Sequence, residues 1–459
     1  MQAPPAAPAA TARASTWAYE VDAAPSGREL SVQATLAPGS SAELSVADGA
    51  EPFVRDVEIE EGGAWRPLVS DKGSWQAPGC RARGCRLRYR FMLREAAEAL
   101  RDVSAARRQG DAIEAPPSTW LLRPLEPAPK TTLRFHVTVA PGDAFVSGVF
   151  PAADHADTYE APATPTFQLA YSAFGRLRVR TLPAAPVQIA MTPGSFEAGD
   201  AAIVAWASAC VRAVAGYYGH FPVRHLLVIV TPTGGNGVGF GTTMGGGGAS
   251  ISIAVGKSAD AESLRDDWVL VHEMVHTALP DVEGPQHWLE EGLATYVEPL
   301  ARARAGIVPA EELWGEWVRS MPNGLPQPGD RGLDNTHTWG RTYWGGALFC
   351  LLADVEIRAR THNTKSLDDA LRGILRAGGN IATSWDMARI TAEGDAATGV
   401  HVLADLYAKM GSSPAPVDLA AFWERLGIRT AGGRVVFDDR APYAEARRAM
   451  SSATPGALR

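Results

Sequence analysis

The sequence predicts a multidomain α+β protein in which an antiparallel β-sandwich precedes a mixed domain with a helical C-terminal part. The chain has 459 residues, which gives room for two or three domains with cores of their own. Up to about residue 182, short segments of alternating apolar and polar residues lie between Gly and Pro turns, a pattern typical of strands. Beyond residue 187, longer apolar segments with helical periodicity take their place.

The β-sandwich is expected over residues 16–183, after an Ala- and Pro-rich segment, residues 1–15, that we expect to be disordered. Residues 30–36 and 132–139 alternate between apolar and polar side chains, as half-buried strands do. Only residues 94–107 have the spacing of a helix here. The first domain should therefore consist almost entirely of strands.

The second domain is expected over residues 184–459, where a Pro-Ala-Ala-Pro sequence marks its start. Residues 199–218 have the periodicity of a helix, and the uninterrupted apolar residues 226–230 predict a buried strand. Residues 250–255 predict another strand. The α+β part should extend to about residue 305, and mostly helices should follow it.

A helix that we expect to begin at Ala261 carries His272, Glu273 and His276 in the pattern H-E-x-x-H. Histidines at i and i+4 point both imidazoles to one side of a helix, which suits two corners of a tetrahedral zinc site, and the Glu between them can reach a water on the metal. By chance the pattern is expected on the order of once in a hundred chains of this composition. A helix with two surface histidines is the alternative.

Residues 287–298, HWLEEGLATYVE, follow this helix. They resemble the W-L-x-E-G-x-A-x-Y signature of gluzincin metallopeptidases, in which a second helix supplies a Glu ligand. The resemblance implies that His272, His276 and Glu291 bind one Zn²⁺ per chain and leave a fourth position for water, which marks a catalytic site. Glu290 is the rival ligand, but the signature places the ligand immediately before the Gly.

Tyr343 begins a third segment, YWGGALFC, which runs on to residue 372. The segment resembles the helix that opens with Y-x-K-G in gluzincin aminopeptidases, and above all the glycyl aminopeptidase family, although no PDZ-like segment is found here. The resemblance implies that the Tyr343 hydroxyl donates a hydrogen bond to the oxyanion of the tetrahedral intermediate. Gly345 stands where the family has Lys. His337 is a candidate second donor or a loop histidine, and Thr295 is a candidate partner for a ligand histidine or a packing residue.

Residues 234–248 are rich in glycine. The matching region of gluzincin aminopeptidases carries a G-x-M-E-N-like sequence whose Glu holds the free amino terminus of the substrate. This chain has no acidic residue between Thr231 and Ala259, so either Glu290 or Glu298 takes that role or no free amino terminus is required. Small residues here could let a substrate backbone approach a strand edge, and a surface loop is the alternative. The glycines expected to do this are Gly245, Gly246 and Gly247.

These resemblances imply a thermolysin-like catalytic domain and a zinc peptidase acting on peptides or proteins. Glu273 would take the proton of the attacking water and later transfer it to the leaving amine. The hypothesis we favour is an aminopeptidase for small N-terminal residues. The alternatives are a zinc endopeptidase with an open, glycine-lined cleft and a catalytically silent peptide-binding protein.

Net charge and cysteine content limit the kinds of partner and the cell compartment that we expect for this protein. A net charge of −8 and a pI of about 5.7 argue against a nucleic-acid partner. We expect no apolar segment of transmembrane length, and the sequence predicts no particular oligomeric state. Cys80 and Cys85 could form a disulfide, which would indicate a periplasmic or secreted protein whose leader has been removed; two unpaired thiols in a cytosolic protein are the alternative. Cys210 and Cys350 are expected to be buried free thiols.

Overall fold

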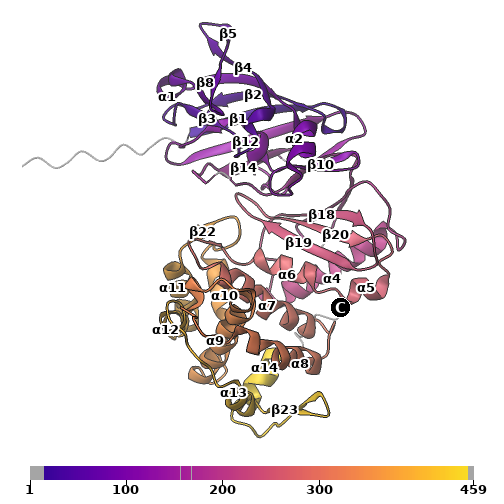
Figure 1. Ribbon diagram of the computed structural model, residues 1–459, viewed down its shortest axis with the longest axis vertical. Coiled ribbons are helices and arrows are strands. Elements are labelled where there is room, and N and C mark those ends of the chain that lie inside the picture. The colour runs from indigo at the N-terminus through magenta and orange to yellow at the C-terminus, as the bar shows by residue number, and fades with distance from the viewer. Residues whose placement is uncertain (1–14, 156, 167, 184, 453–459) are drawn as a thin grey trace, which may run out of the picture. The chain divides into compact units, whose positions relative to one another are not determined.

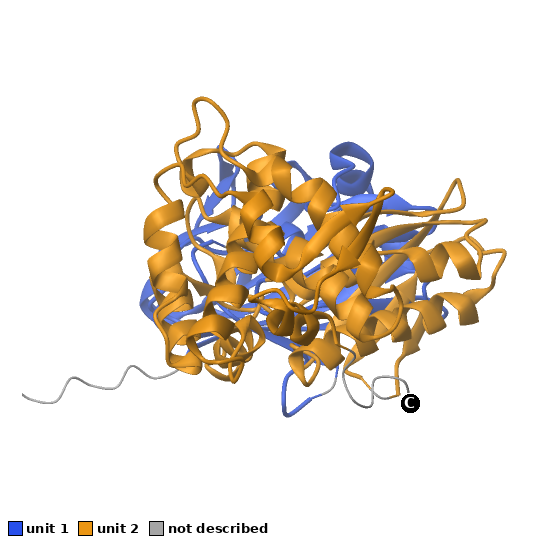
Figure 2. Ribbon diagram, turned by 90° about the horizontal axis from the view of Figure 1, so that it is seen from below, with its two compact units in different colours: residues 1–178, 246–248 blue, residues 179–245, 249–459 orange. Residues whose placement is uncertain are grey.

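The computed structural model describes residues 15–155, 157–166, 168–183 and 185–452, and these form two compact units. Unit 1 consists of Met1–Arg178 with Gly246–Gly248, and unit 2 of Val179–Gly245 with Ala249–Arg459 (Figures 1 and 2). Apart from Ser15, which opens the first strand, the segment expected to be disordered lies outside the described residues. The predicted multidomain α+β class is confirmed, and the predicted boundary at residue 183 stays a prediction.

The largest sheet of unit 1 has seven strands. In spatial order they are β14 (Thr158–Pro162), β12 (Thr131–Val139), β1 (Ser15–Ala23), β2 (Leu30–Leu36), β8 (Cys85–Phe91), β4 (Val54–Glu61) and β5 (Ala64–Pro67). Residues in β2 alternate strictly between buried and exposed, as the sequence pattern predicted. Neighbouring strands of this sheet are antiparallel except for β1 and β12, which run parallel and so depart from the expected purely antiparallel sandwich.

Among the residues that the structure describes, unit 1 has two further sheets of four strands each. One has the order β13 (Ala144–Ser147), β15 (Ser172–Gly175), β10 (Ala112–Glu114), β9 (Arg107–Gln109), and the other β11 (Arg123–Pro124), β3 (Glu43–Ser45), β7 (Ser74–Gln76), β6 (Ser70–Asp71). The buried Trp120 meets Phe135 of β12 and Phe174 of β15 edge-on, with ring centroids 5.7 and 5.8 Å apart. These aromatic contacts join the large sheet to a smaller one in a single core.

Helices in unit 1 differ from the expectation. The helix predicted over residues 94–107 is α2 (Leu93–Leu100), which ends because Arg101 adopts a left-handed conformation with φ of 55°. Two short helices, α1 (Pro78–Arg83) and α3 (Pro117–Trp120), both begin at a proline, where the missing N–H costs no helical hydrogen bond. A disulfide joins Cys80 of α1 to Cys85, the first residue of β8.

Unit 2 is built on a five-stranded sheet. The order is β16 (Arg178–Thr181), β17 (Val187–Met191), β18 (Leu226–Thr233), β20 (Ser250–Gly256), β19 (Val238–Met244). Strands β17, β18 and β20 are parallel, and Leu226–Thr233 is buried over its first six residues, as expected for an uninterrupted apolar run. Strand β19 is antiparallel to β20 and lies at the edge of the sheet.

Helix α4 (Asp200–Tyr218) is long and apolar enough, by length and composition alone, to cross a membrane, which the sequence analysis did not anticipate. Half of its apolar window is buried, and it packs against the two helices that carry the metal-site motifs. Among its buried side chains are Trp206, Cys210 and Tyr217. In this structure α4 is a core helix of unit 2.

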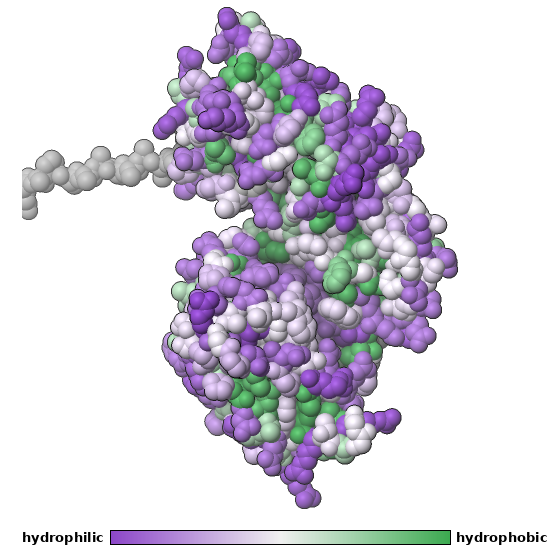
Figure 3. All heavy atoms as spheres, in the orientation of Figure 1, coloured by the Kyte–Doolittle hydropathy of each residue, from purple (hydrophilic) through white to green (hydrophobic). Residues whose placement is uncertain are grey.

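On the face of the molecule drawn in Figure 3, hydrophobic residues lie in separate areas among hydrophilic ones.

The helix expected to begin at Ala261 is divided in two, α5 (Ala261–Asp266) and α6 (Val269–His276). Asp267 causes the break, because its carboxylate accepts hydrogen bonds from the main-chain N–H groups of Val269 and Leu270, at 2.9 and 3.1 Å. It thereby satisfies two of the free N–H groups at the start of α6. Helix α6 then packs against β19 and β20 (Figure 1).

The rest of unit 2 is mostly helical, as predicted. Its α- and π-helices are α7 (His287–Arg304), α8 (Ala310–Ser320), the π-helix η5 (Gly340–Gly345), α9 (Gly346–Arg360), α10 (Leu367–Arg376), α11 (Met387–Thr398), α12 (Leu403–Met410), α13 (Leu419–Leu426) and α14 (Ala444–Ser451). Two short 3-10 helices, η3 (Met321–Gly324) and η4 (Leu333–Asn335), lie between α8 and η5. Two small pairs of strands accompany these helices. Strands β21 (Asp281–Val282) and β22 (Ser384–Trp385) are parallel, and β23 (Ile428–Ala431) and β24 (Arg434–Phe437) are antiparallel.

Candidate metal centre

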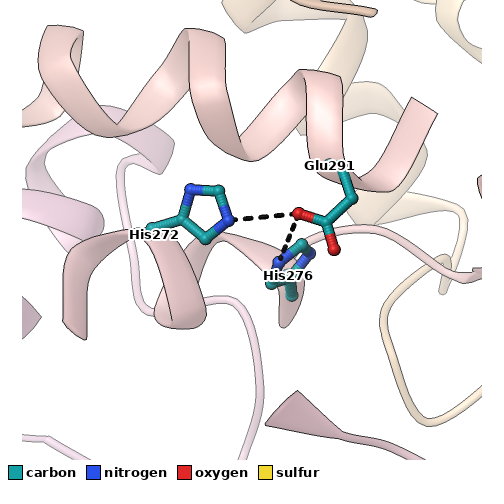
Figure 4. A group of neighbouring side chains, drawn as sticks. All are labelled: His272, His276 and Glu291. Carbon is teal, nitrogen blue, oxygen red and sulfur yellow. Dashed lines mark hydrogen bonds and ion pairs between the residues drawn. The ribbon is translucent and has the colours of Figure 1, made fainter. Parts of the chain in front are cut away.

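Helices α6 and α7 bring His272, His276 and Glu291 together (Figure 4). The two histidines lie one turn apart on α6, and their ring centroids are 5.0 Å apart. Glu291 lies in the second turn of α7, which packs across α6, and its Oε2 is 3.3 Å from Nε2 of His272 and 3.7 Å from Nε2 of His276. Three donor atoms therefore converge on one point between two helices.

This donor set fits zinc. Tetrahedral ligands at bond lengths of about 2.0–2.2 Å lie about 3.4 Å from one another, close to the spacing of the Glu291 oxygen and the two imidazole nitrogens. Burial, and after it the neighbouring His272, lowers the pKa of His276 to about 4, so its imidazole is neutral and free to bind a metal. Burial acts to raise the pKa of Glu291, but the hydrogen bond with His272 and the electrostatic effect of the neighbouring histidines outweigh it and lower that pKa.

Glu273 lies beside this cluster and is held by the edge strand β19. The Thr243 hydroxyl lies 2.5 Å from Oε2 of Glu273 and 3.0 Å from its main-chain oxygen. A Cβ on Gly241 would lie 2.5 Å from Cγ of Glu273, so glycine makes room for the carboxylate. Burial raises the pKa of Glu273, and the Thr243 hydrogen bond opposes the rise. A carboxylate with a raised pKa is a better proton acceptor near neutral pH.

His287 and Glu290, both on α7, form a chain of contacts that ends at the ligand Glu291. His287 places Nε2 3.6 Å from Oε1 of Glu291 and Nδ1 2.7 Å from Oε2 of Glu290. Glu290 in turn accepts a hydrogen bond from the main-chain N–H of Val282, at 2.9 Å. This chain of contacts orients the ligand carboxylate, as groups behind a metal ligand do. Its signal in the sequence was the i, i+3 and i, i+4 spacing of His287 and the two glutamates.

Tyr343 reaches the cluster from the π-helix η5. Its ring stacks on that of His272 with centroids 6.4 Å apart. Burial and then the neighbouring charge of Glu291 raise the pKa of Tyr343 to about 12, so its hydroxyl keeps its proton and remains a hydrogen-bond donor. A π-helical turn often occurs at functional sites. The structure therefore brings together all five residues expected to bind metal or take part in the reaction: His272, Glu273, His276, Glu291 and Tyr343.

No known protein family matches the chain by sequence, and no curated protein does. Among solved structures, an aminopeptidase N family protein from Idiomarina loihiensis superimposes with a TM-score of 0.62 at 12% identity, over 90% of this chain and 78% of that one. An M1 zinc metallopeptidase from Deinococcus radiodurans gives 0.54 at 15% identity, over 88% and 95%. A mutant of an M1 zinc metallopeptidase from that organism, bound to a Tyr-Ser-Ala substrate, gives 0.53 at 15%, over 88% and 96%. The chain shares their fold.

Thr295 and His337, also singled out in the sequence, are not among the three donor residues of the cluster. The Thr295 hydroxyl donates to the main-chain carbonyl of Glu291 at 2.8 Å, the usual bond of a helical threonine to the residue four before it, rather than to a histidine ring. His337 is exposed in the irregular segment before η5. Their expected roles stay predictions.

The three glycines pack against other backbone segments. A Cβ on Gly245 would lie 2.2 Å from the carbonyl oxygen of Ile381, within unit 2. Within unit 1, the carbonyls of Gly246 and Gly247 accept hydrogen bonds from the N–H groups of Ala170 and Phe150. Close backbone approach explains why glycine stands at these positions. Their role in substrate binding stays a prediction.

Proposed function

We propose that this chain is a zinc-dependent peptidase. The observation that carries the proposal is the convergence of three metal donors with a buried carboxylate, Glu273, and a protonated phenol, Tyr343. The shared fold supports it, because one neighbour of that fold is an M1 zinc metallopeptidase mutant bound to a Tyr-Ser-Ala substrate. The resemblance of the HWLEEGLATY segment to the gluzincin signature supports it independently.

The chemistry follows from what each group is able to do. Zinc, when bound by His272, His276 and Glu291, supplies a Lewis acid that lowers the pKa of water and polarises a carbonyl. Glu273 accepts a proton from the attacking water and returns it to the leaving amine, held for this by the Thr243 hydroxyl. Tyr343 donates a hydrogen bond to the oxygen on which negative charge develops.

We favour an aminopeptidase, with an endopeptidase as the second candidate. The aminopeptidase N family neighbour supports the first. A specific observation supports the second: both carboxylates considered as anchors for a free amino terminus are engaged. Glu290 accepts from Val282 and contacts His287, and Glu298 is buried and accepts a hydrogen bond from Arg302 at 2.9 Å. The preference for small N-terminal residues rests on the resemblance to glycyl aminopeptidases alone.

We also propose that the protein is periplasmic or secreted. The disulfide between Cys80 and Cys85 supports this, because reducing cytosolic conditions disfavour structural disulfides. Alkylation of the protein as it is isolated from fractionated cells tests it. We expect two reactive thiols after denaturation, from the buried Cys210 and Cys350, and four only after reduction. Four thiols without reduction would contradict the proposal.

Cleavage mapping by mass spectrometry tests the activity. A diverse peptide library, half of it N-acetylated, is incubated with zinc-loaded wild type, with Glu273→Gln and with the exposed control Glu283→Gln. We expect the wild type and the control to cleave, and Glu273→Gln to keep its zinc and lose turnover by several orders of magnitude. Loss of single residues from free amino termini identifies an aminopeptidase, and internal cuts that ignore acetylation identify an endopeptidase. No cleavage by the zinc-loaded wild type would favour the silent peptide-binding protein.

A further inference from the structure

Four aromatic rings of unit 2 contact one another in succession and form a row that includes two residues of the metal centre. Trp339 stacks on Tyr343 with ring centroids 6.1 Å apart, and Tyr343 stacks on His272 at 6.4 Å. Trp268 meets the His272 ring edge-on at 5.6 Å. The inner two rings, Tyr343 and His272, belong to the metal centre, so each tryptophan ends the row in contact with a different residue of that centre.

The local sequence spacing produces this row. Trp268 is four residues before His272 at the start of α6, and Trp339 is four residues before Tyr343 at the start of η5. Side chains four residues apart lie on the same face of a helix, one turn from each other. Each tryptophan is therefore held beside a residue of the metal centre by its own helix, without a flexible connection.

Both tryptophans are open to solvent, in contrast to the tryptophans of the core. Trp268 is 51% exposed and Trp339 is 63% exposed, while Trp17, Trp120, Trp314 and Trp317 are fully buried. A tryptophan side chain offers roughly 150–250 Å² of largely apolar surface, which folding normally removes from water. The two exposed indole rings therefore provide apolar surface next to the metal centre that is available to a ligand.

We propose that Trp268 and Trp339 determine specificity by binding large apolar side chains, aromatic ones above all, on the two substrate residues that flank the scissile bond. The inference rests on the proposed function, because a peptide bond held at the metal centre places one substrate residue on each side of it. Aromatic side chains stack or meet edge-on at centroid separations of roughly 4.5–7 Å, the arrangement that the row already uses within the protein.

Two carboxylates lie near the row, and both already have partners within the protein. Glu273 is engaged by the Thr243 hydroxyl, and Glu291 by the histidines of the metal centre. The ring faces of Trp268 and Trp339 are therefore the groups of the row that are available to a ligand, because Glu273 and Glu291 already have other partners. This proposal therefore predicts a preference for large apolar residues at the cleavage site, in place of the preference for small N-terminal residues that the resemblance to glycyl aminopeptidases implied.

Matched peptides test the proposal. The peptides are identical except for Phe, Leu, Lys or Ala at the residue directly before or directly after the scissile bond. Values of kcat/KM are compared for wild type, Trp268→Ala, Trp339→Ala and the conservative Trp339→Phe. We expect the wild type to prefer Phe to Ala on the order of tenfold at each position, and each Trp→Ala change to abolish the preference at one of them. Trp339→Phe should retain most of it.

Two further measurements make the result decisive. Val436→Ala removes an exposed apolar side chain from β24, in a hairpin that contacts α8 and α13, and should leave every ratio unchanged. Calorimetric binding of the same peptides to zinc-loaded Glu273→Gln, alone and combined with Trp339→Ala or Trp268→Ala, reads out recognition without turnover.

The outcomes separate the two proposals. A Phe-to-Ala ratio near one in the wild type, ratios unaffected by both Trp→Ala changes, or equal preference for Lys and Phe would overturn the assignment of the tryptophans. If the wild type cleaves no peptide, the proposed peptidase activity fails by itself. The calorimetric affinities for the Phe and Ala peptides then test the role of the tryptophans. The proposal is supported if tighter binding of the Phe peptides depends on Trp268 and Trp339, and it is contradicted if that binding does not depend on them.

Discussion

Gly292 and Gly346 meet backbone to backbone where helices α7 and α9 cross. A Cβ built on Gly292 would lie 2.3 Å from the Cα and carbonyl carbon of Gly346, a separation that no side chain tolerates. Gly292 directly follows the ligand Glu291, and Gly346 directly follows the π-helix that carries Tyr343. The close approach of these two glycines therefore sets the distance between a metal ligand and the proposed oxyanion donor.

We expect Gly292→Ala to push the two helices apart. Forcing one methyl group into a close-packed contact costs about 1–3 kcal/mol of unfolding free energy, measurable by urea denaturation. The loss of activity should be larger than the loss of unfolding free energy by itself explains, because Tyr343 moves relative to Glu291. The matched control is Gly216→Ala, at a glycine of α4 whose added Cβ would meet nothing within 4 Å, and which should gain up to about 1 kcal/mol from helix propensity. Equal effects of both changes would contradict the argument.

His287 is expected to raise zinc affinity through Glu291. Its imidazole lies between the carboxylates of Glu290 and Glu291, and removing such a partner from behind a ligand typically weakens metal binding 10- to 100-fold. We therefore expect His287→Ala to lower zinc affinity by about tenfold or more in competition with a chelator. Glu290→Gln, which disturbs the same chain of contacts one step farther away, should have a smaller effect. Unchanged affinity in both variants would show that Glu291 holds its position alone.

The sequence predicted those parts of the site that depend on spacing within one helix. His272 and His276 lie one turn apart because i and i+4 share a helix face, and residues 287–298 matched a known signature. The contributions from other elements were not predictable in this way. Thr243 and Gly241 reach Glu273 only because β19 is the edge strand beside α6, a consequence of sheet order that no local pattern encodes. The break at Asp267 was missed for a similar reason, since periodicity continues through it.

Glu298 should make stability depend on pH in the metal-free protein. Burial, only partly offset by Arg302, raises the pKa of Glu298 from 4.5 to about 7. The folded state therefore binds a proton more tightly than the unfolded state, so the contribution is fully present below pH 4.5 and is lost as pH rises to about 7. The loss should be on the order of 3 kcal/mol.

Glu298→Gln isolates this contribution. The unfolding free energy of wild type minus that of the variant should decrease between about pH 5 and pH 8 in urea titrations of the metal-free proteins. Zinc is left out because its positive charge would lower the pKa of nearby carboxyl groups. A difference that stays constant over this range would show that Glu298 is ionised in the folded protein throughout.

Thr243 should act on turnover by orienting the general base. Its hydroxyl holds Oε2 of Glu273 at 2.5 Å, and valine has the same shape without the hydroxyl. Thr243→Val therefore leaves the carboxylate free to rotate away from the attacking water, and we expect kcat to fall about 10- to 100-fold with KM little changed. Zinc content should be unaltered, because the hydrogen bonds of the Thr243 hydroxyl go to Glu273 and not to a metal ligand. The neighbouring Thr242 is exposed, since successive residues of a strand face opposite sides, so Thr242→Val should retain full activity. A rise in KM at constant kcat in Thr243→Val would instead place the hydroxyl in substrate binding.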